Sequence, residues 1–405
     1  MALHQESRPM IGFSGTNGKT SAILMTNFIL EQCGLKPASL STWQGPKKFL
    51  QFREKAKDSD CLLVEVAYDA LRLKQITGDI FQGGTLTNIS LDHLSFCRTP
   101  EQYTAAKITF INELPGNAKI IINADDPMAL AAVPEKNGDF LIYATEYPRA
   151  MVFADNIRCR RSYSSFRLTV NEELYGFAGK PAAPGSAPVR LRPAGRHNVA
   201  NALLAATVSL LFVPDLQAVA RALCLFPGIR RNMEFFSVNQ QPVIDDAGKN
   251  PAAIRAVLSA AESYGCQRIM MLHGIYGGAG KTLNMCNARE LAAWLKRNPA
   301  NMLFVTRSMY HCKSRHQVRL SEEKAFLEEL KTSGVEFAYY PDLPDALDSL
   351  LAHAAKDDLL LLLGGPVLNR ARELISGSTG KYESYLPEPL PISSRTNAAI
   401  PHNPS

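Results

Sequence analysis

Short apolar runs alternate with longer helical stretches through the first half of the chain. An apolar run is typical of a strand buried on both faces of a parallel sheet, and the stretches between such runs predict crossover helices. The predicted strands are Met10–Phe13, Cys61–Val66, Gly84–Ile89, Lys119–Asn123 and Phe140–Ala144, and the predicted helices include Ala22–Gln32 and Pro100–Asn112. This alternation predicts a doubly wound, mostly parallel α/β sheet.

The pattern changes near residue 150. Short alternating segments such as Ser165–Val170 predict a small antiparallel subsheet over about 150–192. The Pro- and Gly-rich stretch Lys180–Pro188 predicts a flexible loop, and Ser39–Ser59 has mixed signals. A helical region begins at Gly195–Ala206 and runs to about Leu225.

The α/β alternation restarts after Phe226–Arg231, whose Pro-Gly pair predicts a hinge. The predicted strands are Val243–Asp246, Arg268–His273, Met302–Thr306, Phe337–Tyr340 and Leu359–Leu363, and the predicted helices are Pro251–Glu262, Asn284–Arg297 and Glu322–Ser333. We therefore expect a P-loop-type domain over 1–228, a smaller Rossmann-like α/β domain over 229–384 and a disordered tail over 385–405.

Composition excludes several classes of protein. The chain has 405 residues and a net charge of +6 without a dense Lys/Arg run, so we expect no nucleic-acid partner. The eight cysteines are scattered without a C-x-x-C pair, which favours reduced thiols. There is no signal-peptide core, and the apolar run Leu359–Leu363 is too short to cross a membrane. We expect a cytoplasmic monomer or homodimer.

The stretch Ile11–Ser21 (IGFSGTNGKTS) places a glycine-rich turn between a predicted strand and a predicted helix. Backbone N–H groups at such a junction bind phosphate. The candidate cofactor-binding residues here are Gly15, Thr16, Asn17, Gly18, Lys19, Thr20 and Ser21. Lys19 can reach terminal phosphates, and the Thr20 hydroxyl can bind Mg²⁺. The alternative is a strand-to-helix turn that needs its glycines for backbone reasons alone.

Glu65 is a lone acid near the carboxyl end of the predicted strand Cys61–Val66. An acid in such an apolar strand is costly unless it is paired, and this end of an open α/β sheet faces the ligand crevice. We therefore expect a functional role, with a solvated strand-end acid as the alternative.

Several blocks in order resemble the Mur ligase family, whose members are ATP-dependent ligases that join a carboxylate to an amine. The blocks are GTNGKTS, LVEVAYDAL, TNISLDHLSF, YTAAKITFI, NADDP, GRHNVANALLAA and DDAGKNPAAI. The resemblance runs from about Met10 to about Asn369. It implies that ATP converts a carboxylate to an acyl phosphate, which an amine attacks with release of ADP and phosphate.

The resemblance also assigns the metal and catalytic residues. Lys19 would contact the β- and γ-phosphates, while Thr20 and Glu65 would hold one Mg²⁺. His93 and Lys107, the latter as a carbamate, would hold a second Mg²⁺ near the substrate carboxylate. A carbamate is the kind of anionic oxygen ligand that Mg²⁺ prefers. The catalytic set implied is thus Lys19, His93 and Lys107.

The nucleotide contacts are assigned in the same way. Asn198 would lie near the adenine, Asp246 would contact the ribose, and either Arg230 or Arg231 would serve ATP. Without the resemblance, His93 would be a core histidine, Lys107 a solvated helix position and Asn201 an ordinary polar position. We expect structural roles for the two remaining candidates, Asp92 and His197.

The chain departs from the family at several points. Only a short segment precedes the first predicted strand, so we expect no UDP-binding N-terminal domain and a small or carrier-free acid as substrate. Lys249 stands where the family has a histidine. The glycine-rich turn Gly277–Lys281 lacks the family's Arg-Asp pair, and Gly364–Val367 replaces a G-K-G-H pattern. These motifs therefore do not predict which amine is the substrate.

Three alternative functions remain. A folylpolyglutamate-synthase-like ligase is disfavoured by Thr20, where that type has glycine. A lipid II-amidating type would carry a cysteine-rich zinc insertion, and the chain has no C-x-x-C pair. A non-catalytic ATP-binding or scaffold protein has no use for two metal sites.

Overall fold

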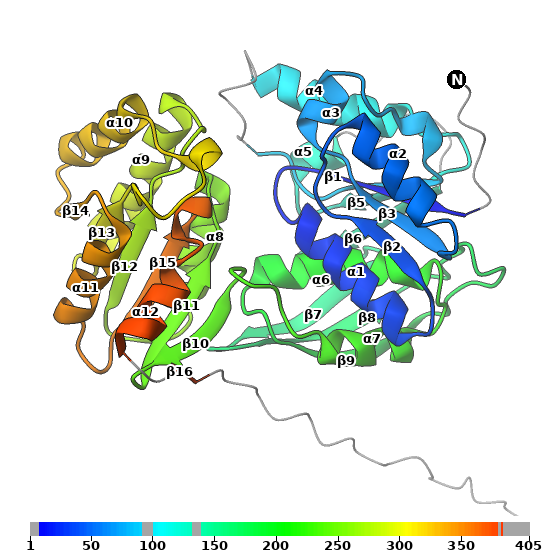
Figure 1. Ribbon diagram of the computed structural model, residues 1–405. Coiled ribbons are helices and arrows are strands. Elements are labelled where there is room, and N and C mark those ends of the chain that lie inside the picture. The colour runs from blue at the N-terminus through cyan, green and yellow to red at the C-terminus, as the bar shows by residue number, and fades with distance from the viewer. Residues whose placement is uncertain (1–7, 91–99, 132–138, 380–381, 384–405) are drawn as a thin grey trace, which may run out of the picture.

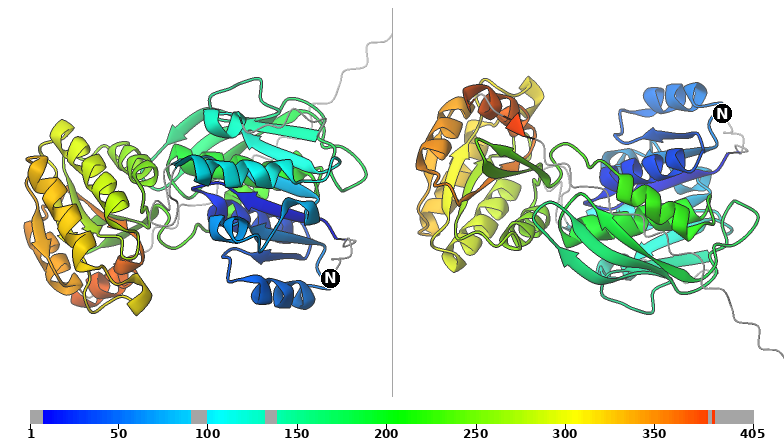
Figure 2. Two further views of the ribbon diagram at one scale, coloured as in Figure 1. Left: turned by 90° about the horizontal axis from the view of Figure 1, so that it is seen from above. Right: turned by 90° about the horizontal axis from the view of Figure 1, so that it is seen from below.

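The computed structural model describes residues 8–90, 100–131, 139–379 and 382–383. The chain forms two α/β units that lie side by side, each built on its own sheet (Figure 1). Views from above and from below show the same arrangement (Figure 2). The predicted disordered tail over 385–405 lies outside the described residues.

The first unit contains a nine-stranded sheet of order β2-β3-β1-β4-β5-β6-β7-β8-β9. The strands are β1 (Met10–Ser14), β2 (Pro37–Leu40), β3 (Cys61–Glu65), β4 (Gly83–Leu86), β5 (Lys119–Asn123), β6 (Asp139–Ala144), β7 (Val152–Cys159), β8 (Ser164–Val170) and β9 (Gly185–Leu191). Pairs from β2 through β7 are parallel, and β7-β8-β9 pair antiparallel. The antiparallel strands therefore continue the parallel sheet, and the predicted doubly wound fold is confirmed.

Helices cover both faces of this sheet because successive strand residues point to opposite sides. Ile11 and Phe13 of β1 pack with the helices of one face, whereas Met10 packs with those of the other. The first face carries α1 (Lys19–Gln32), α6 (Arg196–Leu210) and α7 (Leu216–Leu225). The second carries α2 (Pro46–Lys55), α3 (Tyr68–Arg72), α4 (Pro100–Asn112) and α5 (Pro127–Leu130).

The second unit contains a seven-stranded sheet of order β14-β13-β12-β15-β11-β10-β16. The strands are β10 (Glu234–Val238), β11 (Gln241–Asp246), β12 (Ile269–Gly274), β13 (Met302–Thr306), β14 (Ala338–Tyr340), β15 (Leu359–Gly364) and β16 (Tyr382–Glu383). One face packs against α8 (Pro251–Glu262), α9 (Lys281–Arg297) and α10 (Leu320–Thr332), and the other against α11 (Leu343–His353) and α12 (Ala371–Thr379). Among the described strands, β10 pairs antiparallel with both β11 and β16 and the other pairs are parallel, so this is the predicted second α/β unit.

The prediction of a loop over Lys180–Pro188 is wrong at its end, because β9 begins at Gly185. Pro188 pairs opposite Arg167 in the register with β8. A proline, which lacks an N–H, is tolerated here because β9 is the edge strand of the sheet. The buried residues Ala187 and Val189 alternate with exposed ones, and this period-two signal identifies the strand.

The mixed stretch Ser39–Ser59 contains the end of β2 and all of α2. Every residue of β2 is only partly buried, since this strand lies at the opposite edge of the sheet. An edge strand needs no continuous apolar run, so the pattern that identifies buried strands does not apply there.

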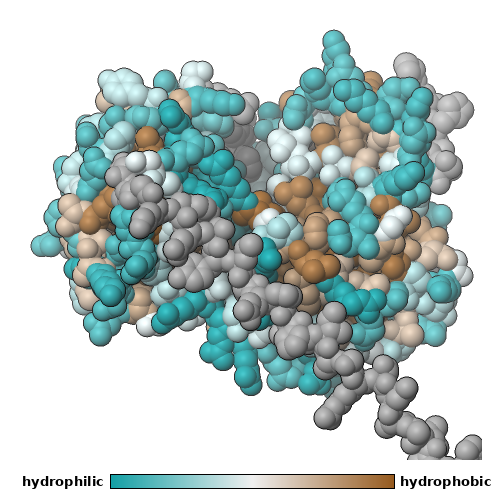
Figure 3. All heavy atoms as spheres, turned by 60° about the horizontal axis from the view of Figure 1, so that its bottom comes forward, coloured by the Kyte–Doolittle hydropathy of each residue, from teal (hydrophilic) through white to brown (hydrophobic). Residues whose placement is uncertain are grey.

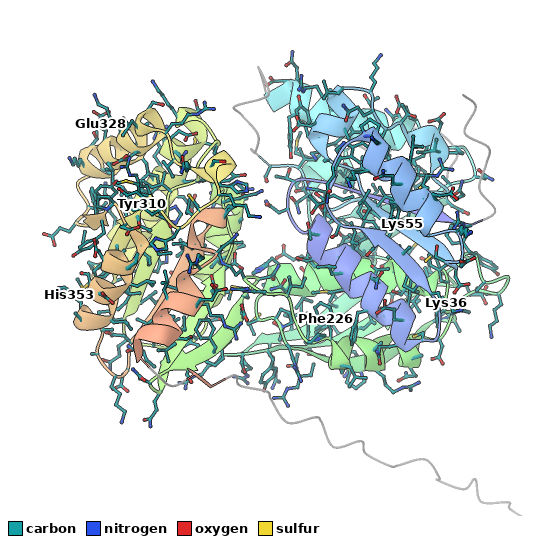
Figure 4. All side chains as sticks on the ribbon, in the orientation of Figure 1. Lys36, Lys55, Phe226, Tyr310, Glu328 and His353 are labelled. Carbon is teal, nitrogen blue, oxygen red and sulfur yellow. The ribbon has the colours of Figure 1, made fainter. Side chains whose placement is uncertain are left out.

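None of the helices in the described ranges is long and apolar enough to cross a bilayer. On the face shown in Figure 3, hydrophilic side chains cover most of the surface, and hydrophobic ones gather near its middle. Phe226, labelled in Figure 4, follows α7 and is only 3% exposed. Its ring packs edge-on against Phe28 of α1 at a centroid distance of 5.5 Å, which anchors the start of the predicted hinge on the first unit.

His273 lies in the core of the second unit at the end of β12. Its side chain is 1% exposed and stacks on Phe326 of α10, with ring centroids 5.3 Å apart and planes 6° apart. Burial lowers the pKa of His273 to about 3, and a contact with the backbone of Leu363 opposes this only weakly. The imidazole is therefore neutral in the folded protein at physiological pH.

We expect His273→Phe to flatten the acid dependence of stability. The pKa of the folded state lies below the unfolded value of about 6.5, so the unfolded state binds the extra proton, and stability falls as pH drops from about 6.5 toward 3. When the pH is lowered from about 7 to about 5, the wild type should lose about 2 kcal/mol more of its free energy of unfolding than His273→Phe loses. Denaturant unfolding of both proteins at these two pH values measures this difference. Equal losses of unfolding free energy in the two proteins would contradict the prediction. Above about pH 7.5 the unfolding free energies of the two proteins should change with pH in parallel.

Candidate active site

The phosphate loop connects β1 to α1 at the carboxyl edge of the first sheet (Figure 1). Gly15 has φ of 129° and Gly18 has φ of 86°, in the region that favours glycine. A Cβ on Gly15 would overlap the Thr87 side chain, and one on Gly18 would overlap the Asn201 amide. The loop can therefore lie this close to its neighbours only with glycine at both positions.

Lys19 lies along its own loop. Its Nζ donates to the carbonyl oxygens of Gly15 at 2.9 Å and Thr16 at 3.0 Å. The loop is also held from outside by Asn88. The Asn17 N–H donates to the Asn88 side-chain Oδ1 at 3.0 Å, and the Thr16 N–H donates to the Asn88 backbone carbonyl oxygen at 2.9 Å. The backbone is thus preformed, and the lysine lies within reach of a phosphate held by the loop.

Thr20 and Glu65 meet across the sheet edge. The Thr20 hydroxyl donates to Oε2 of Glu65 at 3.0 Å. A hydroxyl and a carboxylate oxygen are the hard ligands that suit Mg²⁺. Across the described ranges there is no group of three or more His, Cys, Asp or Glu side chains that could hold a metal ion. A Mg²⁺ held by Thr20 and Glu65 would take water and phosphate oxygens as further ligands, as this ion commonly does.

Lys107 is buried against the phosphate loop, with 1% exposure. Its Nζ donates to the Gly15 carbonyl oxygen at 2.6 Å and lies 4.5 Å from the centroid of the Tyr103 ring. The Tyr103 hydroxyl in turn donates to Oγ1 of Thr16 at 3.2 Å. The structure therefore places Lys107 inside the site and not on the solvated helix face that its position alone would suggest.

His93, predicted as a catalytic and metal-binding residue, lies outside the described residues, as does Asp92. The described ends of the segment lie at the site: Ser90 borders the cleft between the units, and α4, which follows the segment, carries Lys107.

A cleft of about 480 Å³ lies between the two units. It runs along the carboxyl edges of both parallel sheets, where open α/β sheets bind ligands. The first unit lines it with residues that include Asn17, Gly18, Ser21, Thr87, Asn88, Asn123, Asp125, His197 and Asn201, and the second with Arg231, Asn232, Asp246, Lys249 and Ala253.

The cleft is lined by neighbours of Asn198, the residue expected near the adenine, and not by Asn198 itself. Asn198 is fully buried, and its Nδ2 donates to the Ala194 carbonyl oxygen at 2.9 Å, whereas His197 and Asn201 line the cleft. Burial lowers the pKa of His197 to about 4, so its ring is neutral at physiological pH. The spacing of His197 and Asn201 could have identified this face, because residues four apart share one side of a helix.

Asp246 lies at the carboxyl end of β11, in the wall of the cleft. Its carboxylate accepts hydrogen bonds from the N–H groups of Met233 at 2.8 Å and Gly248 at 2.7 Å. Burial raises the pKa of Asp246 to about 6, and it does the same for the neighbouring Asp245. The carboxylate is thus fixed in orientation in the wall of the cleft.

Arg230 and Arg231 point in different directions. The structure does not bring Arg230 to the cleft: its guanidinium, half exposed, lies on Glu373 at 3.2 Å. Arg231 is 6% exposed and its guanidinium donates to Asp245 at 2.9 Å and to the carbonyl oxygen of Gly364 at 2.6 Å. The guanidinium of Arg231 thus ties the interunit connection to the second sheet.

Among the described residues, side-chain hydrogen bonds join the units at the phosphate loop. The amides of Asn17 and Asn250 bond reciprocally at 2.8 Å and 3.3 Å, and Asn232 donates to Oγ of Ser21 at 2.7 Å. Sequence reasoning does not single out Asn232. Its contact depends on the turn around it, where Arg231 has φ of 58° and Met233 has φ of 47°.

Comparisons with known proteins agree with this geometry. The family model of the Mur ligase middle domain matches residues 13–209, and that of the Mur ligase glutamate ligase domain matches residues 231–365. The UDP-N-acetylmuramate–L-alanine ligase of Desulfotalea psychrophila is 26% identical over 377 residues, which are 92% of this chain and 76% of that protein. The UDP-N-acetylmuramoyl-L-alanyl-D-glutamate–2,6-diaminopimelate ligase of Bacillus velezensis is 25% identical over 382 residues, with 88% and 72% coverage.

Solved structures share the fold. MurF ligase from Thermotoga maritima, in complex with ADP, superposes with a TM-score of 0.73 at 15% identity, over 93% of this chain and 82% of that one. MurF from Acinetobacter baumannii gives a TM-score of 0.70 at 18% identity, with 93% and 78% coverage. The predicted resemblance is confirmed: the chain belongs to the Mur ligase family of ATP-dependent ligases that form a C–N bond between a carboxylate and an amine.

Proposed function

We propose that the chain uses ATP·Mg²⁺ to convert a small-molecule carboxylate to an acyl phosphate, which an amine then attacks to give an amide, ADP and phosphate. The observation that carries the proposal is the meeting of Thr20 and Glu65 at 3.0 Å, directly beside the loop lysine Lys19. That arrangement joins a phosphate site to an oxygen-ligand pair for Mg²⁺.

Each of these residues has a role in the transfer. Backbone N–H groups of residues 15–20 and Lys19 hold the β- and γ-phosphates, and Thr20 and Glu65 would hold Mg²⁺. When bound, Mg²⁺ would supply positive charge that neutralises the phosphate oxygens. Phosphoryl transfer depends on such positioning and neutralisation more than on covalent help from the protein. His197, Asn201 and Asp246 line the part of the cleft that remains for the nucleoside.

The proposal extends to a second Mg²⁺ held by His93 and a carbamate on Lys107. Support comes from the placement of Lys107, whose Nζ is buried beside Gly15 of the phosphate loop and over Tyr103. A carbamate there would exchange a cation for an anionic oxygen ligand.

We expect Lys107→Ala to remove ligase activity, and added bicarbonate should not restore it. In the wild type, labelled carbon dioxide should give a carbamate NMR signal that is absent from Lys107→Ala. Lys119→Ala is the matched control, because Lys119 lies at the amino end of β5 and pairs with Asp139. Full activity in Lys107→Ala, or a carbamate signal that survives in it, would remove this role.

We also propose that the chain acts in the cytoplasm as a monomer or homodimer on small-molecule substrates. The named relatives act on UDP-N-acetylmuramate or on UDP-N-acetylmuramoyl-L-alanyl-D-glutamate. A substrate panel should therefore contain acids with and without a UDP-sugar, each combined with amino acids and other amines.

Formation of ADP across this panel tests the proposal. ADP should form when an accepted acid and amine are present together and should stay near background with either alone. ADP formation that does not depend on either substrate would contradict the ligase, whereas ATP binding without ADP formation anywhere in the panel would favour a non-catalytic nucleotide-binding protein.

A further inference from the structure

Lys249 lies in the wall of the cleft, on the second unit, immediately before α8. The next residue, Asn250, bonds reciprocally with Asn17 at 2.8 Å and 3.3 Å. Asn17 precedes Gly18 in the phosphate loop. Lys249 is therefore adjacent in sequence to the point where the second unit touches the loop that would hold the phosphates of ATP.

The backbone at Lys249 is fixed from two sides. Its carbonyl oxygen accepts a hydrogen bond from Nδ2 of the fully buried Asn287 at 3.0 Å. On its other side Asn250 caps α8, because Oδ1 of Asn250 accepts from the N–H of Ala253 at 2.9 Å. The Cα–Cβ direction of the lysine is thus set by the second sheet and its helices.

The lysine side chain also has a defined support. Its Nζ lies 5.3 Å from the centroid of the Tyr276 ring, in the loop after β12. Gly365, after β15, lies below both: a Cβ there would be 3.2 Å from the Tyr276 ring and 3.9 Å from Cβ of Lys249. The ammonium therefore lies over the Tyr276 ring, and the start of the side chain lies close to the loop after β15, both at the carboxyl edge of the second sheet.

A second cation at this place would meet a chemical need. Charge spreads over the equatorial oxygens of the phosphoryl group during transfer, and a lysine ammonium provides a compact positive charge for it. Lys19 approaches from within the loop, where its Nζ contacts the carbonyl oxygens of Gly15 and Thr16. Lys249 lies in the opposite wall of the same cleft.

We propose that Lys249 is a catalytic lysine that contacts the γ-phosphate of bound ATP from the second unit. This rests on the ligase function proposed above. A lone pair of the substrate carboxylate forms the new P–O bond, and the bond from the γ-phosphorus to the bridging oxygen breaks with its electron pair leaving on ADP. Lys249 balances the charge on the transferring group, and no proton moves in this step.

Equilibrium binding of ATP·Mg²⁺ and ADP·Mg²⁺ tests the proposal without turnover. Lys249→Ala should weaken the affinity for ATP·Mg²⁺ about tenfold or more, because a charge-assisted hydrogen bond is lost. The affinity for ADP·Mg²⁺ should change by less than about twofold. The kcat should fall about 100-fold, a loss comparable to removing one oxyanion donor. Lys249→Arg should recover part of both losses. Lys281→Ala is the control, because Lys281 begins α9 and lines a separate groove with Met285 and Ser321.

Two results would overturn the assignment in variants that melt like the wild type. An equal loss of affinity for ATP and for ADP would mean that Lys249 contacts another part of the nucleotide or has a structural role. Unchanged nucleotide affinities with a raised KM for the acid would place it on the substrate. Failure of the wild type to bind either nucleotide would instead remove the proposed function, and this inference with it.

Discussion

Replacing Lys19 with alanine should lower acid- and amine-dependent phosphate release by at least about 1,000-fold. Lys19 is the cation inside the phosphate loop, and catalysis of phosphoryl transfer depends on charge placed around the phosphate oxygens. Its Nζ donates to carbonyl oxygens of its own loop at 2.9 Å and 3.0 Å. Because Lys19 is only partly buried at the start of α1, its loss should spare the fold. A coupled phosphate assay and a thermal melt of the same preparation measure the two effects.

Lys55→Ala is the matched control for this experiment. Lys55 lies in the last turn of α2, away from the cleft, as Figure 4 shows. It should keep the wild-type rate. Near wild-type turnover in Lys19→Ala would mean that the loop does not hold the reacting phosphates, and the ligase mechanism would fail.

Arg231→Ala should destabilise the second unit by about 3–5 kcal/mol, the cost of removing one partner from a buried ion pair. Arg231 is 6% exposed and its partner Asp245 is 0% exposed. The substitution leaves the Asp245 carboxylate buried without its cation, and it frees the carbonyl oxygens of Gly364 and Gly365. Denaturant unfolding, followed by a signal from the second unit such as Trp294 fluorescence, measures the loss.

Arg230→Ala supplies the neighbouring control. Its guanidinium and Glu373 are each more than half exposed, so this pair should contribute less than about 1 kcal/mol. Burial already raises the pKa of Asp245 to about 6, so its carboxyl can take up a proton when Arg231 is absent. The loss should therefore shrink when the pH is lowered from about 8 to about 5. A loss below about 1 kcal/mol in Arg231→Ala would show that the buried network is not needed.

The arrangement of the first sheet follows from its sequence pattern. Because parallel strands end at one edge, a loop after β1 and an acid at the end of β3 must come together, and Thr20 and Glu65 do so at 3.0 Å. Buried strands such as β12 and β15 are also readable, since their residues pack on both faces. Edge strands are harder to read, because β2 and β9 have an unpaired side and tolerate exposed residues or proline.

Side-chain direction in the cleft depends on local geometry that the motifs do not contain. His197, one residue before Asn198, faces the cleft because of the phase at which α6 begins after Gly195, whose φ is 102°. Arg230 and Arg231 diverge because Arg231 takes a left-handed backbone conformation, which sends its guanidinium into the second sheet. Sequence reasoning accordingly assigns Asn198 to the adenine and His197 to a structural role, and it leaves Arg230 and Arg231 both eligible.

The central claim is that ATP activates a carboxylate as an acyl phosphate at this site. The most direct measurement uses the acid and amine that give the highest rate in the substrate panel, with heavy oxygen in the carboxylate. Mass spectrometry of the released phosphate should find one labelled oxygen transferred per turnover, because the carboxylate oxygen that attacks the γ-phosphorus leaves with the phosphate. Amide formation with no label in the phosphate would contradict the account.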